Sequence, residues 1–260
     1  MNRLRLEWSI FIKSLRVLKK NRRLLNLLVP VTVFCLLLWC LAAGTVQRLL
    51  SQPWDSITTG ETVIAAVRLF LLLFAGIPVY RLISVFLTGI FYSEMIRGFG
   101  DDQILIKRGL LFAFIKRKAL LKWALKGWMF PGKGNVFAVP TILCDEEAEE
   151  PSVIHERAAA TVEHIWHPEG GFKGLIVLLI LSCLFTAALP LLALQFARDL
   201  PPGTIKHAVM CLIPAAAAAA LIFTGLVLTA RKVYIAALFC YAHGPDEVGE
   251  FTREELKNGF

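Results

Sequence analysis

Four long apolar runs divide the chain. The first covers residues 24–44 and contains no charged side chain. A helix needs about 20 residues to cross the hydrocarbon core of a membrane, so this run is long enough to span one. Residues 62–97, 172–197 and 208–230 form the other three runs. The pattern predicts an all-α polytopic membrane protein with about four transmembrane helices and additional amphipathic helices on the cytoplasmic face.

The run at residues 62–97 is longer than one bilayer crossing. As a single helix it would extend for about 54 Å, against a hydrocarbon thickness of about 30 Å. Either one tilted helix bends near Gly76 and Pro78, or a hairpin crosses the membrane twice. We favour the single helix, because a turn at Pro78 would leave polar backbone in lipid. Arg68 would then lie near the outer headgroups and Arg81 at the inner surface.

Residues 1–23 are predicted to form an amphipathic, basic helix. Apolar positions recur at spacings of three and four, and lysines and arginines occupy the other faces. The apolar positions are Leu4, Trp8, Phe11, Leu15 and Leu18. Such a helix either lies in the plane of the lipid headgroups or packs against protein. We take the interfacial helix as the working hypothesis.

Residues 101–171 are predicted to form a cytoplasmic collar of amphipathic helices. The first part mixes many lysines with leucine and tryptophan, which is typical of one or two interfacial helices. Residues 135–144 are apolar but contain a proline, which favours a buried or re-entrant segment. An acidic turn follows at residues 145–150, and a surface helix is expected to begin near Pro151. Its predicted apolar stripe consists of Ile154, Ala158, Val162 and Ile165.

The membrane part is predicted to consist of two halves, residues 24–100 and 172–243. A cytoplasmic tail follows at residues 244–260, in which Thr252 and Glu255 have the spacing of a capping box.

An internal duplication is a further hypothesis. The order of elements is amphipathic helix, span, short outer loop and long helix, and it occurs from Met1 to Gly100 and again from Ser152 to Gly244. Parallel repeats of this kind are common in transport proteins.

The distribution of charge predicts the orientation. Residues 1–23 hold eight lysines and arginines against one acid. Because cytoplasmic loops carry an excess of these bases, both termini are expected in the cytoplasm. The chain is 57% apolar with a net charge of +8. Its bases lie beside spans, which favours anionic lipid headgroups over nucleic acid as their partner.

Two groups of side chains are candidates for binding. The bases expected to contact lipid headgroups are Arg16, Lys19, Lys20, Arg22, Arg23, Arg81, Lys116, Arg117, Lys118, Lys122, Arg231 and Lys232. The acids expected to dock a protein partner are Asp145, Glu146, Glu147, Glu149, Glu150 and Glu163. Each group concentrates charge of one sign, which steers association with a partner of the opposite sign.

A metal site is the alternative for the acidic region. His164 and His167 are three residues apart and could share one face of a helix with Glu163 nearby. The third ligand of a defined motif is missing, and His155 does not begin an HExxH sequence. We therefore expect no metal, no cofactor and no catalytic residue.

Four segments carry a resemblance to a known family. They are LEWSIFIKSLRVLKKNRRLL followed by VP, the helix ending FYSEMIRGFGDD, the segment VFAVPTILCDEEAEEPSVIHERAAATVEHIW, and YIAALFCYAHG. With these, the chain resembles a family of uncharacterised multi-span membrane proteins of prokaryotes. The resemblance implies an inner-membrane location and two further spans, where this chain has only the basic stretch 107–134. The family has no established activity, so it implies no functional residue.

These features predict a non-catalytic inner-membrane protein that acts as a partner or scaffold subunit of a larger assembly. Its basic cytoplasmic face would contact anionic lipid. A transporter or lipid-handling subunit is the alternative, based on the possible repeat and on Arg81 near the inner surface.

Overall fold

The computed structural model describes residues 3–27, 29–35, 37–38, 41, 45, 59–100, 103–130, 132–165, 204–244 and 248–258. The structure is all-helical, and none of these residues belongs to a strand. The predicted fold class is confirmed at that level. The chain forms two compact units. Unit 1 comprises residues 1–28, 95–104 and 160–260, and unit 2 comprises residues 29–94 and 105–159.

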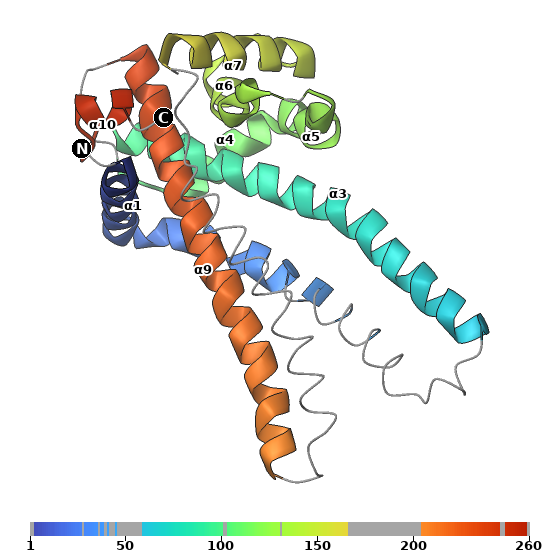
Figure 1. Ribbon diagram of the computed structural model, residues 1–260. Coiled ribbons are helices and arrows are strands. Elements are labelled where there is room, and N and C mark those ends of the chain that lie inside the picture. Colours follow the sequence, from blue (N-terminus) through green and yellow to red (C-terminus); the bar gives the residue numbers. More distant parts are fainter. Residues whose placement is uncertain are drawn as a thin grey trace. The chain divides into compact units, whose positions relative to one another are not determined.

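Unit 1 is built around the long helix α9. Helix α9 runs from Thr204 to His243, and both α1 (Arg3–Lys20) and α10 (Arg253–Asn258) pack against it (Figure 1). A short 3-10 helix, η1 (Arg22–Leu27), follows α1. The C-terminal half of α9 is buried at Val233, Tyr234 and Ala236 to Leu238. This half of α9 forms the core of the unit.

The face of α1 that packs on protein differs from the predicted one. Leu6, Ile10, Val17 and Leu18 are buried, whereas Trp8 is 57% exposed. Helix α1 packs against α9, so the second alternative, a helix packed on protein, holds for this face. Of the predicted stripe, Leu18 is buried and Phe11 and Leu15 are half-buried, so the prediction is wrong at Trp8. Helix α1 has apolar residues on more than one face, and the packing against α9 decides which of them are covered.

Unit 2 is built around the helix α3 (Thr59–Gly98), which is continuous over 40 residues (Figure 1). The single-helix alternative for residues 62–97 is therefore correct, and the hairpin is wrong. Pro78 lies inside the helix. Large apolar side chains are exposed from Val63 to Val79, and nearly all side chains are buried from Thr88 to Met95.

Five short helices cover the buried half of α3 or pack on one another in unit 2. They are α4 (Ile106–Ile115), α5 (Arg117–Lys126), η3 (Gly127–Met129), η4 (Lys133–Val136) and α6 (Ala138–Cys144). Residues 138–143 of α6 are all buried, as expected for the apolar segment 135–144. Helix α7 (Pro151–Ile165) starts at the predicted proline, and its stripe residues Ile154, Ala158 and Val162 are buried.

Two of the described helices are long and apolar enough to cross a membrane, Val63–Gly98 in α3 and Ile222–His243 in α9. Of the most apolar 18 residues in each, 12% are buried in the first and 56% in the second. The predicted span 172–197 lies outside the described residues. Leu24, at the start of the predicted span 24–44, is fully buried in η1, and the next described helical residues begin at Val29. The span itself stays a prediction.

Candidate functional site: an apolar and basic surface on helices α4 and α5

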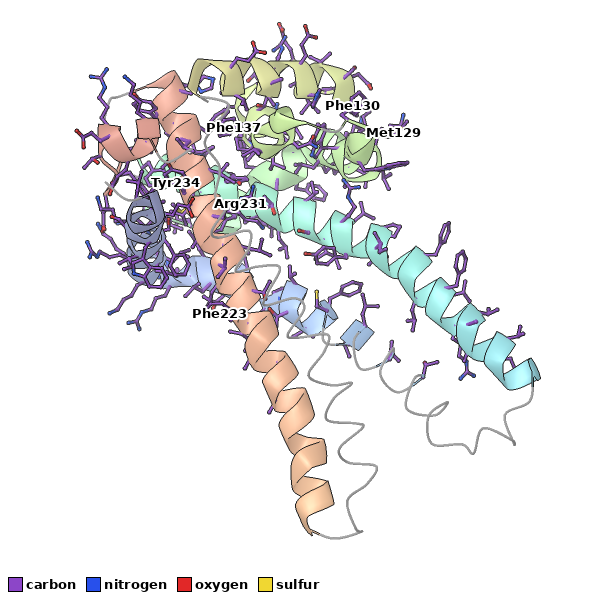
Figure 2. The ribbon with its side chains drawn as sticks, viewed as in Figure 1. Met129, Phe130, Phe137, Phe223, Arg231 and Tyr234 are labelled. Carbon is purple, nitrogen blue, oxygen red and sulfur yellow. The ribbon has the colours of Figure 1, made fainter. Side chains whose placement is uncertain are left out.

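Unit 2 exposes a contiguous set of large apolar side chains on α4, α5 and η3. They are Leu110, Leu111, Phe114, Ile115, Leu121, Leu125, Trp128 and Met129, each about half to two-thirds exposed. On α4 and on α5 these residues recur at spacings of three and four and therefore share a face. Figure 2 labels Met129, which belongs to this set. An exposed apolar patch of this size marks a surface that binds a partner or a membrane.

Basic side chains lie within the same surface. Arg117, Lys118 and Lys126 are exposed on α5, and Lys107 is exposed on α4. The Arg117 guanidinium lies 4.5 Å from the centroid of the Phe114 ring, and its Nη1 donates to the Phe114 carbonyl oxygen at 3.2 Å. Bases beside exposed leucine and tryptophan are typical of helices that lie in the headgroup region of a membrane. We call these apolar and basic side chains the α4–α5 face.

Close helix packing holds the α4–α5 face against α3. A Cβ atom at Gly109 of α4 would lie 2.8 Å from Cγ of Glu94, and one at Gly89 of α3 would lie 3.1 Å from Cδ1 of Leu120. Both glycines therefore allow an approach that larger residues would prevent. Leu120 is 1% exposed. The side of α5 that carries Leu120 therefore faces α3, and the opposite side of the helix is exposed.

A buried carboxylate fixes the start of α4. Glu94 is fully buried, and its Oε2 accepts a hydrogen bond from the backbone N–H of Leu105 at 2.7 Å. The Arg108 guanidinium also donates to both Glu94 oxygens at 3.4 Å. The carboxylate thus satisfies a backbone donor at the N-terminus of α4, where the helix dipole favours negative charge. Sequence reasoning missed Glu94, although it is the only acid in the C-terminal third of the apolar run 62–97.

Several of the candidate docking acids are held by ion pairs within unit 2. Arg157 binds the carboxylates of Asp145 and Glu147, and Lys122 binds Glu150. The hydrogen bond from Arg157 holds the pKa of the Asp145 carboxyl below its usual range. In the same way, the hydrogen bond from Lys122 lowers the pKa of Glu150. These pairs order the acidic turn against α5 and α7.

The remaining docking candidates, Glu146, Glu149 and Glu163, are exposed. A partner of positive charge can therefore reach these three directly, whereas it would have to displace an internal base from the others.

The predicted headgroup contacts fall into four settings. Lys19, Lys20, Arg22 and Arg23 are exposed at the end of α1 and in η1, and Arg16 is exposed but forms an ion pair with Glu250 at 3.4 Å. Lys116 donates to the carbonyl oxygen of Asp145 at 3.0 Å, and Lys122 is paired as described. Arg81, Arg231 and Lys232 are half-buried on the long helices. The structure thus brings only Arg117 and Lys118 of the twelve into the α4–α5 face as fully exposed bases.

A second polar cluster joins the two ends of the chain in unit 1. Glu255 of α10 accepts hydrogen bonds from Lys13 Nζ at 2.7 Å and from Ser9 Oγ at 3.1 Å, both on α1. Its Oε2 also accepts from the Thr252 N–H at 3.1 Å, which is the glutamate half of the predicted capping box. From α9, the Tyr234 hydroxyl donates to the Glu255 carbonyl oxygen at 2.8 Å. Helix α1, helix α9 and the start of α10 therefore meet at Glu255.

The Glu255 cluster predicts acid-sensitive packing of α10. Burial alone raises the pKa of the Glu255 carboxyl, but hydrogen bonds from Lys13, Thr252 and Ser9 outweigh this and leave the pKa below its usual range. A lowered pKa gives stability that is present above the unfolded value of about 4.3 and is lost as the pH falls through the folded value. We expect protease protection of residues 248–258 to decrease below about pH 4. Glu255→Gln should remove this dependence, and a decrease that persists in the variant would contradict the assignment.

Histidine and metal candidates do not form a site among the described residues. No group of three or more His, Cys, Asp or Glu side chains in these residues has the geometry of a metal site. His155 packs against the ring of Phe130, with centroids 5.7 Å apart. His167 and the side chain of His164 lie outside the described residues.

An open groove lies beside the exposed half of α3. It has a volume of about 710 Å³ and is lined by leucines of residues 38–41 and by α3 residues from Arg68 to Val79. Arg68 is the one charged side chain among the described lining residues. A Cβ at Gly76 would lie 3.2 Å from Cδ1 of Leu38, so the two segments approach closely at one end of the groove.

Comparison of the chain with protein-family models, with curated proteins and with solved structures finds no match.

Proposed function

We propose that the chain is an integral membrane protein with about four spans that serves as a scaffold or partner subunit rather than as an enzyme. Its α4–α5 face lies on the inner leaflet of a prokaryotic inner membrane and contacts anionic lipid, and both termini are cytoplasmic. The exposed acids of the turn 145–150 bind a protein partner.

The observation that supports this proposal most strongly is the change of burial along α3. Val63, Phe70 and Phe74 are 55–70% exposed, whereas Ile90, Phe91 and Met95 are at most 3% exposed. Exposure of the first stretch to water would be unfavourable, because leaving each side chain of this size in water costs about 2 kcal/mol of free energy relative to burying it. Lipid removes that cost. The inner sides of α4 and α5 pack on the buried half of α3 through Gly109 and Leu120, as expected for helices at the membrane surface.

Purification of the full chain in a mild detergent, followed by identification of bound protein and lipid, tests the proposal. We expect a protein partner at constant ratio and an enrichment of anionic lipid over the bulk membrane. The variant Glu146→Gln/Glu149→Gln should release the protein partner without releasing the lipid. Glu254→Gln, an exposed acid of α10, is the matched control and should retain both.

Two outcomes contradict the proposal. A chain that stays in solution without detergent is not an integral membrane protein. A monomer that carries neither protein nor anionic lipid is not a scaffold at the membrane surface.

A transporter or lipid-handling subunit is the second candidate. The groove of about 710 Å³ beside α3, with Arg68 as the one charged side chain in a mostly apolar described lining, favours it. An arginine in such a lining suits a phosphate or carboxylate group. Movement of an anionic lipid or solute across vesicles that contain only this chain would favour this candidate over the scaffold.

A further inference from the structure

A small groove opens between α5 and the middle of α3. Leu82 and Phe86 of α3 form one side, and Leu120, Leu121 and Ala124 of α5 form the other. Its volume is about 320 Å³. Sites for small ligands begin at about this size, so the groove accommodates one hydrocarbon chain rather than a bulky molecule.

The groove lies at the end of the lipid-exposed part of α3. From Val63 to Leu82 the helix rises by about 29 Å at 1.5 Å per residue, which matches a hydrocarbon thickness of about 30 Å. Large apolar side chains are exposed as far as Val79, and the following residues become half-buried. The groove is therefore continuous with the part of α3 that would face acyl chains and begins where headgroups are expected.

Two cationic side chains belong to the lining of the groove. Arg117 and Lys118 line the groove together with Phe114. The contact with Phe114 uses one N–H of Arg117, and a guanidinium has five, so donors remain for a second acceptor. A guanidinium and an ammonium beside apolar lining residues can bind a phosphate group that is joined to a hydrocarbon chain.

We propose that this groove binds a single anionic glycerophospholipid. One acyl chain lies along Leu82, Phe86 and Leu121, and the phosphate accepts hydrogen bonds from Arg117 and Lys118. This inference deepens the proposed function and rests on it, because it requires the α4–α5 face to lie at the membrane surface. It adds a defined stoichiometry and a defined site to the general attraction between a basic surface and anionic lipid.

Native mass spectrometry of the full chain in detergent tests the site. The protein is titrated with phosphatidylglycerol or with phosphatidylcholine of the same acyl chains. We expect one phosphatidylglycerol to be retained in preference to phosphatidylcholine. The variant Arg117→Gln/Lys118→Gln should weaken its retention about tenfold, because it removes charge-assisted hydrogen bonds. The control Arg253→Gln/Lys257→Gln removes the same charge from exposed positions of α10 and should have little effect.

A second pair of variants tests the apolar part of the groove. Leu121 and Leu125 are 51% and 49% exposed on the same helix, but only Leu121 lines the groove. We expect Leu121→Gln to weaken lipid retention several-fold and Leu125→Gln to leave it unchanged. Neither replacement disturbs a buried residue, so both chains should fold.

The outcomes separate this inference from the proposed function. If both basic pairs weaken retention equally, or both leucine variants do, the lipid is held by the surface in general and the groove is not a site. That result overturns the inference, but it does not contradict the proposal that the α4–α5 face contacts anionic lipid. If neither lipid is preferred and no variant changes retention, the inference is likewise wrong. The proposed function would be contradicted as well by a chain that is stable in solution without detergent, or by a monomer that carries neither protein nor anionic lipid.

Discussion

Tyr234→Ala is expected to lower the free energy of unfolding of unit 1 by about 4 kcal/mol. The Tyr234 side chain is fully buried on α9, and its ring meets Phe251 edge-on with centroids 5.6 Å apart (Figure 2). Its hydroxyl also binds the Glu255 carbonyl oxygen. Alanine would leave a cavity at the point where α10 packs on α9. The midpoint of thermal unfolding in detergent and the protease sensitivity of residues 248–258 measure the loss.

Tyr234→Phe is the matched control. It keeps the ring against Phe251 and removes only the hydroxyl, so we expect a loss of about 1 kcal/mol. The two variants thereby separate packing from hydrogen bonding. Equal losses in both would show that the hydroxyl, rather than the buried ring, holds α10 in place. No loss in either would contradict the packing of α10 on α9.

Much of the helical organisation could be predicted from local sequence. The start of α7 at Pro151 follows from a proline after an acidic turn, and its buried stripe follows from the 3.6-residue period. The continuity of α3 through Pro78 could be predicted because a hairpin turn there would leave backbone groups without partners in lipid. These signals lie within a few residues of the feature that they predict.

The contacts that hold the helices together could not be predicted in this way. Glu255 and Lys13 are separated by 242 positions in the chain, and no local pattern pairs them. Arg157 and Lys122 are charged, so the sequence alone suggests that they face solvent. In the structure they form ion pairs with Asp145 and Glu150, two of the acids that we assigned to partner docking. The buried face of α1 depends on α9, which is distant in sequence. Sequence therefore located the charged groups but not their internal partners.

Helices α3 and α9 share an arrangement that bears on the predicted duplication. Each is 40 residues long, and each is exposed in an earlier apolar stretch and buried near its end. In both, a polar side chain at the buried end forms a hydrogen bond with the helix that follows. The Glu94 carboxylate of α3 accepts from the Leu105 N–H at the start of α4, and the Tyr234 hydroxyl of α9 donates to the Glu255 carbonyl oxygen in α10. The internal repeat stays a prediction. Its two halves share one feature, a long helix that is exposed in its earlier stretch and is held at its buried end by a contact with the helix that follows.

The same reasoning predicts the effect of Glu94→Ala, which we expect to lower the free energy of unfolding of unit 2 by about 3 kcal/mol. The substitution removes a buried carboxylate and leaves the Leu105 N–H at the start of α4 without its acceptor. Helix α4 would then pack less firmly on α3, and the α4–α5 face would lose its support. The midpoint of unfolding in detergent and hydrogen exchange at residues 105–115 measure these effects.

The variant Glu94→Gln separates the contribution of the negative charge at position 94 from that of the side chain's size and its hydrogen bond to Leu105. Glutamine keeps one oxygen that can accept from the Leu105 N–H, but it cannot offer a charged partner to Arg108. We expect it to lose about half as much stability as alanine does, with exchange at Leu105 close to that of the unchanged protein. If glutamine and alanine were equally harmful, the ion pair with Arg108 would outweigh the bond to the start of α4. If neither variant changed the exchange of residues 105–115, Glu94 would not be what holds α4 on α3, and the α4–α5 face would depend on the close packing at Gly89 and Gly109 instead.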